Sequence, residues 1–436
     1  MIKKVQVSEV EVIKKYKNVS NRALTAGTLA FFAGFAAVAL FGTTVLKVGP
    51  ILHLNLVEIS WLVAIPIVTG SLLRIPFSLL VDKYGRWTLF TQLVIGFLGM
   101  VGIAYTLKQI NTLPHTTAYY MLLLFGAIAG TSISTFSSGI TYVSYFFPQR
   151  KQGTALGIFA GIGNSAPGIF TAILPFALAS LGLVNAYIAW ASFLALMIII
   201  YALISLDPLY ITCIKRCGKN KDEAQNLLKA AGFEIVPSGS LSESLKNASK
   251  DPRVWALVIM YLTSFGGFEA LTEWLPTYWK SFMHVTSVEA GILTGVVYSL
   301  VTALIRIFGG WSSDKFGGEK VALISYIIMI LGSIVFIMAY SIPISVSAEI
   351  IMAIGMGIAN GAVYKLVPRY SPKAVSGASG LVGGLGSAGG LLIPPVMGYI
   401  ASATNFPYAF TVFTILGIVS VALSVTLWKI GGNKNE

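Results

Sequence analysis

Two arginines lie inside long apolar segments, and each stands at the same distance from a similar loop motif. Arg74 precedes Asp82 by eight residues in 72-LLRIPFSLLVDKYGR-86, and Arg306 precedes Asp314 by the same eight. The motif continues as Asp-Lys-Tyr-Gly in the first case and as Asp-Lys-Phe-Gly in the second. A guanidinium keeps its charge at any physiological pH, so an arginine buried in apolar surroundings needs a counter-charge or water.

The spacing also sets the depth of the arginines and suggests their chemistry. Eight helical residues rise about 12 Å, which reaches close to the middle of a hydrocarbon core about 30 Å thick. Neither apolar segment carries an acid beside its arginine. The planar guanidinium fork suits a planar oxyanion, which it can bind through two parallel hydrogen bonds. We therefore expect Arg74 and Arg306 to face each other and to hold a small anion.

The elements that must position these arginines are membrane-spanning helices. The chain has 436 residues, of which 56% are hydrophobic and 11% charged, and its mean hydropathy is +0.79. A soluble protein carries about 25% charged residues. The sequence therefore predicts an all-α integral membrane protein with twelve spans, since runs of this length and composition cross a bilayer. The twelve runs cover about residues 23–46, 57–81, 87–107, 119–142, 152–176, 184–206, 253–279, 288–310, 320–340, 343–364, 374–397 and 405–429.

The net charge of +13 is explained by membrane topology rather than by a nucleic-acid partner. Of the 30 lysines and arginines, only Lys47, Lys108 and Lys280 fall on loops that connect an odd span to the next even one. Positive residues concentrate on the cytoplasmic side of membrane proteins. Both termini are therefore predicted to be cytoplasmic, in a multi-pass protein of the cell membrane whose surroundings are the lipid bilayer.

The chain divides into two halves that resemble each other. Besides the repeated arginine motif, 153-GTALGIFAGIGNSAPG-168 is echoed by 376-SGASGLVGGLGSAGGL-391. Two parallel six-span repeats with a site between them near the midplane are typical of a rocking secondary transporter. We expect the chain to act as a monomer of two pseudo-symmetric six-helix bundles. Its predicted parts are a cytoplasmic N-terminal segment (1–22), a first bundle (23–206), a cytoplasmic central loop (207–252), a second bundle (253–429) and a cytoplasmic tail (430–436).

Several stretches carry a resemblance to a known family. The loop 82–86 and its echo 309-GGWSSDKFGGEK-320 resemble the cytoplasmic loop of the major facilitator superfamily. More specifically, 146-FFPQRKQGTALGIFAGIGN-164 resembles the signature of the nitrate/nitrite porter family. The segments 265-FGGFEALTEWLPTYW-279 and 364–398 are also similar to that family. The resemblance spans essentially all twelve predicted helices and implies the major facilitator fold.

The resemblance implies a substrate and a set of binding residues. The substrates would be nitrate and nitrite, clamped by Arg74 and Arg306. Aromatic rings would sandwich the flat anion, and the positions that match are Phe136 and Tyr261, with Phe265 as a further candidate one turn later.

Small and polar residues in the fifth span allow two interpretations. Asn164 matches a polar position of the family, where its amide would donate to the anion, and an interhelical hydrogen bond accounts for it equally well. Gly153, Gly157 and Gly161 recur at every fourth residue. This spacing predicts close approach of a neighbouring helix.

Glu269 and Glu273 depart from the family pattern, which is usually apolar at these positions. Their spacing of four places both on one helical face. Glu273 precedes Trp274-Leu275-Pro276 and is expected at the membrane interface, whereas Glu269 is expected deeper. Three roles remain open for Glu269, namely a structural ion pair, a proton-coupling site and a substrate-discriminating residue.

The remaining charged candidates are assigned to gating. Asp82, Arg86 and Asp314 follow their spans on the cytoplasmic side. There they can pair with nearby charges or cap a helix of their own half. Individually weak contacts of this kind can form in one conformational state and break in another.

Together these patterns predict a secondary active transporter of nitrate, nitrite or both, working by nitrate/nitrite exchange or by proton symport. The alternative within this fold is a carrier of another small anion, such as a monocarboxylate or cyanate, coupled to protons through Glu269. A membrane enzyme and a transport-like receptor are less favoured. The three histidines are scattered, no metal or cofactor site is indicated, and no GxxxxGK[ST] loop for ATP occurs.

Overall fold

The computed structural model describes residues 19–147, 149–217, 220, 222–224, 226, 241–371 and 374–432. Within these ranges the chain folds into helices and contains no strand. Eleven helices are long and apolar enough to cross a membrane, and one bent helix pair makes up a twelfth span. The predicted all-α, twelve-span fold is therefore confirmed.

The N-terminal half contains the first six spans. Its helices are α2 (Ser20–Phe35), η1 (Ala36–Ala39), α3 (Val45–Leu52), α4 (Leu56–Leu72), α5 (Arg74–Tyr84), α6 (Arg86–Lys108), α7 (His115–Gly130), η2 (Thr131–Ser134), α8 (Thr135–Ser144), α9 (Gln149–Ser180) and α10 (Gly182–Ile204). The first span ends at Ala39, earlier than predicted, because a turn separates it from α3.

Two short helices of the central segment precede the C-terminal half. They are α11 (Leu209–Cys217) and α13 (Leu241–Ser249). The helices of the C-terminal half are α14 (Pro252–Tyr261), η3 (Leu262–Gly266), α15 (Gly267–Ser281), α16 (Ser287–Ile292), η4 (Leu293–Leu300), α17 (Val301–Phe316), α18 (Gly318–Ile337), α19 (Ile342–Tyr370), α20 (Val375–Ser387), α21 (Gly389–Ala403), η5 (Phe406–Phe410) and α22 (Thr411–Gly432).

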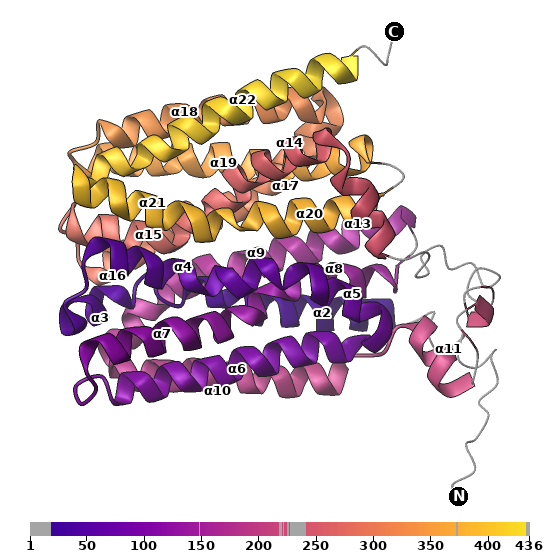
Figure 1. The fold of residues 1–436 in the computed structure, drawn as a ribbon, viewed down its shortest axis with the longest axis horizontal. Coiled ribbons are helices and arrows are strands. Elements are labelled where there is room, and N and C mark those ends of the chain that lie inside the picture. Colours follow the sequence, from indigo (N-terminus) through magenta and orange to yellow (C-terminus); the bar gives the residue numbers. More distant parts are fainter. Residues whose placement is uncertain are drawn as a thin grey trace, which may run out of the picture.

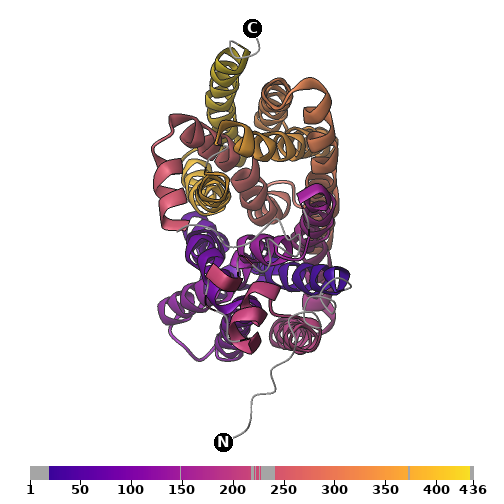
Figure 2. The same ribbon diagram turned by 90° about the vertical axis from the view of Figure 1, so that its right-hand side faces the viewer.

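The two halves lie side by side with their long helices roughly parallel (Figure 1). Seen from one end, the indigo-to-magenta helices occupy one side and the orange-to-yellow helices the other (Figure 2). α11 and α13 lie at one end of the bundle, and α3 and α16 lie at the opposite end (Figure 1). We call these the inner and the outer end, following the orientation that the positive charges predict.

The repeated Asp-Lys-aromatic-Gly motif forms the same turn in both halves. α5 ends at Tyr84 and α17 ends at Phe316, and each is followed by a glycine with positive φ, Gly85 at 59° and Gly317 at 88°. This region of φ favours glycine because a Cβ would be strained there. The motif therefore encodes a tight helix-to-helix turn at the inner end of both halves.

The halves pack closely at the outer end. α4 packs along α21, and α9 packs along α16 and η4. A Cβ on Gly168 of α9 would lie 2.6 Å from the carbonyl oxygen of Gly295 in η4, and a Cβ on Gly291 would lie 2.5 Å from the Pro175 ring. The absence of side chains at these glycines lets the two backbones touch.

The inner part of α9 stands apart from the other half, which corrects one prediction. Gly157 and Gly161 lie on the same helical face as Gly168, yet nothing comes within 4 Å of the space that a Cβ would occupy at either position. The expected close approach at these two glycines is therefore wrong, because α9 diverges from the C-terminal half below Gly168. Gly153 lies outside the residues whose surroundings are described. The structure is thus closed at the outer end and separated along the inner part of α9.

Candidate anion site

Irregular turns of the helices position the candidate site residues. α4 and α5 meet at 42°, and Arg74 is the first residue after the break. Phe136 is the second residue of α8, which follows directly on the 3₁₀ turn η2. Tyr261 ends α14, and Phe265 lies in the π-helix η3. Local π-helical and 3₁₀ turns frequently mark functional sites, because they turn side chains away from the regular helical register.

Arg74 is fully buried and makes two polar contacts with the C-terminal half. Its Nη1 donates to the carbonyl oxygen of Gly383 at 2.8 Å, and its Nη2 lies 3.1 Å from Oε1 of Glu269. Glu269 is also fully buried. The structural ion pair left open for Glu269 is therefore the one that forms, so the expectation of an anion as the only counter-charge is wrong for Arg74. Its counter-charge comes from the seventh span, 195 residues away along the chain, so the second span alone did not reveal it.

Arg306 has different surroundings, although the sequence places it in the equivalent position. It is half-buried, and its Nη2 donates to the hydroxyl oxygen of Tyr261 at 3.2 Å. Its Nη1 is buried and finds no hydrogen-bond partner in the described part of the chain. No ion pair of Arg306 occurs among those residues either. Among the described residues, therefore, only Arg74 of the two arginines has a carboxylate as its counter-charge.

Phe265 connects the two arginines. The guanidinium carbon Cζ of Arg74 lies 5.4 Å from the centre of the Phe265 ring, and that of Arg306 lies 5.7 Å from it. The two Cζ atoms are consequently no more than about 11 Å apart. The distances from the two guanidinium carbons to the ring centre are within the range of a cation–π interaction, about 6 Å. One arginine from each half therefore contacts the same aromatic ring.

The other predicted aromatic residues stack around this ring. Tyr261 lies parallel to Phe265, with ring centres 4.9 Å apart and planes 5° apart. Phe136 stacks against Phe265 at 6.0 Å and also lies 5.1 Å from the Arg74 Cζ atom. The structure thus brings together Arg74, Arg306, Phe136, Tyr261 and Phe265 from the two halves.

Asn164 lies near this cluster and has unused hydrogen-bonding groups. It is 2% exposed, and neither its Nδ2 nor its Oδ1 finds a partner among the described residues. The adjacent Gly163 packs against the Phe31 ring, which in turn contacts Phe136 at 5.1 Å. The interhelical hydrogen bond considered as an alternative is absent from this part of the structure. Buried amides are normally hydrogen-bonded, so its groups remain available to a ligand.

The structure adds residues that sequence reasoning did not select. Tyr364 of α19 lies 5.9 Å from the Arg306 Cζ and 5.4 Å from the Tyr261 ring. It begins the stretch 364–398 that resembles the porter family, which was the available signal. Gly383 contributes only a carbonyl oxygen to Arg74, and side-chain types cannot indicate such a contact.

Glu273 is not at the membrane interface, contrary to the prediction. It is fully buried, and neither carboxylate oxygen has a hydrogen-bond partner among the described residues. The neighbouring Trp274 is fully buried too. The Trp-Leu-Pro sequence is typical of a membrane interface, but α15 packs against helices of both halves. A tryptophan there fills protein interior instead.

The three gating candidates pair within their own halves. Asp82 accepts a hydrogen bond from the Tyr145 hydroxyl, Arg86 donates to the carbonyl oxygen of Ser205 at 3.0 Å, and Asp314 forms an ion pair with Lys365. Burial and the neighbouring Asp82 raise the pKa of Tyr145 far above its usual range, so this hydroxyl stays protonated as a donor. None of these three contacts joins one half to the other.

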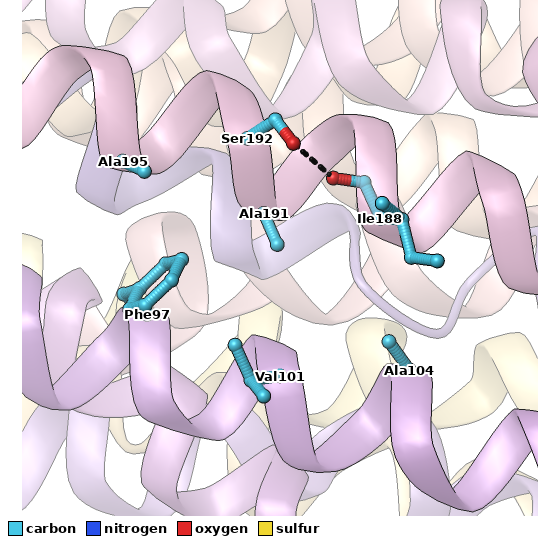
Figure 3. A pocket seen from close by; sticks show the side chains of 7 residues that line it. All are labelled: Phe97, Val101, Ala104, Ile188, Ala191, Ser192 and Ala195. Carbon is cyan, nitrogen blue, oxygen red and sulfur yellow. Dashed lines mark hydrogen bonds between the residues drawn. The ribbon is translucent and has the colours of Figure 1, made fainter.

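A hollow on the outside of the N-terminal half is not a candidate for the anion. It has a volume of about 260 Å³ and lies between α6 and α10, where Phe97 and Val101 face Ala191 and Ala195 (Figure 3). No charged side chain lines it. The described residues also contain no group of three or more potential metal ligands.

Comparison with known proteins identifies the family of this chain. Residues 26–297 and 283–431 match the Major Facilitator Superfamily. A probable nitrate transporter, NarT of Staphylococcus aureus, is 30% identical over 408 residues, which cover 93% of this chain and 95% of the relative. A probable nitrate/nitrite antiporter, NarK1 of Thermus thermophilus, is 28% identical over 94% of this chain and 92% of the relative. The chain belongs to the nitrate/nitrite porter family of the major facilitator superfamily.

This porter also shares its fold with a structurally characterised sugar transporter. The xylose transporter XylE from E. coli, in a partially occluded inward-open conformation, superposes with a TM-score of 0.72. The match covers 94% of the porter and 99% of XylE at 13% sequence identity. This likeness shows the major facilitator fold.

Proposed function

We propose that this porter carries nitrate, nitrite or both across the cytoplasmic membrane by alternating access, with the anion bound between Arg74 and Arg306. The names of the relatives support the substrate. The meeting of two guanidinium groups from different halves at one aromatic ring supports the position of the site.

The observation that carries the proposal is the unpaired Arg306. Its Nη1 is buried without an acceptor among the described residues, beside a ring that also faces Arg74. A buried donor left without a partner costs about 1–3 kcal/mol, and more when it is charged. A small anion supplies both the missing acceptor and the missing charge. Asn164 and the aromatic rings complete a site suited to a flat oxyanion.

The ion pair between Arg74 and Glu269 gives the site a second state. While the pair is intact, one Arg74 donor group is committed to Glu269. An anion that engages Arg74 must therefore compete with this carboxylate or arrive when it is neutral. Nitrate/nitrite exchange needs only the competition, whereas proton symport uses the neutral form.

The remaining features of the proposal concern the whole chain. One chain supplies both arginines, so we expect a monomer to suffice for transport. We expect both termini and the gating residues Asp82, Arg86 and Asp314 to lie on the cytoplasmic side. The distribution of positive charge supports this orientation.

Competition for uptake by liposomes tests the substrate. Purified porter is reconstituted, and uptake of isotopically labelled nitrate is measured with nitrite, cyanate, lactate or chloride in excess outside. Nitrite is expected to inhibit strongly, while the other three anions have little effect beyond ionic strength. Inhibition by cyanate or lactate with no effect of nitrite, or an absence of nitrate uptake above protein-free liposomes, would overturn the assignment.

A further inference from the structure

One face of α15 carries three polar side chains that point into the protein interior. Glu269, Glu273 and Thr277 follow one another at intervals of four residues, and they are 0%, 0% and 2% exposed. Residues with this spacing are neighbours on a helix, with Cβ atoms about 5–6 Å apart. The three side chains therefore form a continuous polar line through an otherwise apolar region.

Two members of this line have no partner for their polar atoms. Among the described residues, no hydrogen-bond partner occurs for either carboxylate oxygen of Glu273 or for the hydroxyl of Thr277. An ionised carboxylate without donors or a cation costs several kcal/mol in buried surroundings. Glu273 is therefore expected to be neutral in this conformation, which means that it carries a proton.

The groups around the line make it a path that ends at Arg74. Glu269 faces Arg74 of α5 and Ser387 of α20, with Tyr261 on its own span. Glu269 is the charged or titratable neighbour of Glu273. A Cβ on Gly42 would lie 3.0 Å from the backbone oxygen of Glu273, so backbone rather than charge covers it on that side.

Other titratable groups that approach α15 contact residues that lie off this polar line. Glu349 of α19 accepts a hydrogen bond from the Trp279 indole at 3.3 Å, and Trp279 lies on a different face of α15 from Glu273. The Tyr298 hydroxyl of η4 donates toward the carbonyl oxygen of Gly267 and the Met356 sulfur. These groups do not interrupt the line.

The outer end of the line opens into a cavity between the halves. This cavity has a volume of about 570 Å³ and is lined by Thr277 and Lys280 of α15 and by His53, which follows α3. α3 lies at the end opposite α11 and α13 (Figure 1). The polar line thus connects the outer cavity with the Arg74–Glu269 pair.

We propose that Glu273 relays protons between the outer cavity and Glu269, so that the porter couples anion uptake to proton uptake. This inference rests on the proposed function and adds the residues that would deliver the proton to Glu269. A proton from the outer medium passes by way of Thr277 to Glu273, which gives its own proton to Glu269. Neutral Glu269 releases Arg74, which then binds the anion. After the anion leaves at the inner end, Glu269 returns its proton to the cytoplasm and the ion pair forms again.

The relay separates two measurable activities. Net nitrate uptake into liposomes that contain a trapped pH indicator acidifies their interior if protons accompany the anion. Isotopic exchange of nitrate against nitrate needs no net proton movement. Glu273→Gln keeps the shape of the side chain but cannot carry a proton. We expect it to slow nitrate-driven acidification at least about tenfold, while exchange changes less than about twofold; a positioned proton-transfer group typically contributes about 100-fold or more to a rate.

Matched variants distinguish the relay from a general loss of structure. Glu349→Gln removes a buried carboxylate of the same half that lies off the line, and it should acidify like the wild type. Glu273→Asp keeps a titratable group and should restore part of the rate. If Glu273→Gln lowers exchange as well, Thr277→Val and Thr277→Ser decide, because only the valine variant should slow acidification.

The possible results separate the relay from the function on which it rests. Wild-type acidification by Glu273→Gln, or nitrate uptake by the wild type without acidification, would overturn the relay and leave the nitrate porter intact. Equal slowing by Thr277→Val and Thr277→Ser would also overturn it. Absence of both uptake and exchange in the wild type would remove the proposed function and the relay together.

Discussion

Phe265 lies beside both arginines and orients them toward each other. The centre of its ring lies within about 6 Å of both guanidinium carbons, and the ring stacks against Tyr261 and against Phe136. A ring in this position fixes the direction of two long side chains before the anion arrives. Such preorganisation improves affinity because less side-chain freedom is lost on binding.

Replacing this ring should weaken the anion site without unfolding the porter. Phe265→Leu removes cation–π interactions of about 0.5–2 kcal/mol, so the apparent nitrate affinity is expected to fall by about 2- to 30-fold. Phe336→Leu is the control, since Phe336 is buried in the same half but stacks on Phe410 instead. Nitrate uptake measured over a range of nitrate concentrations gives the apparent affinity of each variant. Equal effects of the two variants would show that Phe265 acts only in packing.

Glu269 acts on the same site through charge. Protonation of its carboxylate weakens its hold on Arg74, so wild-type affinity for the anion is expected to rise as the pH falls. Glu269→Gln is neutral at every pH and should bind nitrate with an affinity that depends little on pH. Nitrate uptake at a series of pH values measures this dependence. The coupling role of Glu269 is excluded if the variant keeps the wild-type pH profile.

The same substitution has an expected effect on stability. Removing one partner of a buried ion pair costs about 3–5 kcal/mol, because the other charge is left uncompensated. Nitrate bound to Arg74 would replace the missing charge and stabilise the folded state. Nitrate should therefore raise the Tm of Glu269→Gln more than that of the wild type. An equal rise in both proteins would indicate that the anion does not engage Arg74.

At the scale of elements, α9 shows how one helix can touch the other half at one end only. Gly168 is in backbone contact with η4, whereas Gly157, on the same face toward the inner end, has open space beside it. Closure of the inner end would bring this part of α9 toward the C-terminal half. Glycine at these positions then serves a contact that exists in one state but not in another.

Adding a methyl group at the two ends of this face should have opposite consequences. Gly295→Ala places a Cβ 2.7 Å from the backbone nitrogen of Ala172, so the closed outer end cannot form without displacement. We expect its nitrate uptake to fall about tenfold or more, by analogy with the 1–3 kcal/mol cost of overpacking. Gly157→Ala meets no atom within 4 Å and should fold and bind nitrate normally. Wild-type uptake by Gly295→Ala would contradict the assignment of Gly295 to outer closure.

Hydropathy predicts helices but not their irregular turns. The apolar runs identified the twelve spans, because burial in lipid demands length and composition alone. The break after Leu73 and the π-helix η3 depend on local backbone hydrogen bonding, which an apolar run does not reveal. These are the places where Arg74 and Phe265 lie. The residue types of the site were therefore predictable, whereas the turns that aim them were not.

At the scale of the whole molecule, the two halves are similar in sequence but unequal in charge. The repeated spacing indicated a pair of arginines inside the bundle, and the structure buries Arg74 fully and Arg306 by half. Neither span contains an acid beside its arginine. Arg74 forms an ion pair with Glu269 of the other half, and no single segment of the sequence contains both residues. Arg306 has no carboxylate partner in the described part of the chain. The site therefore holds one free positive charge and one conditional one, which suits binding of a single small anion.

The most direct test of this account is nitrate affinity after each arginine is replaced by lysine. Lysine keeps the positive charge but loses the planar fork that can bind an oxyanion through two hydrogen bonds. Arg74→Lys and Arg306→Lys are each expected to weaken nitrate binding at least about tenfold, equivalent to about 1.4 kcal/mol, as measured by equilibrium binding to the purified porter. Wild-type affinity in both variants would contradict the clamp between the two halves.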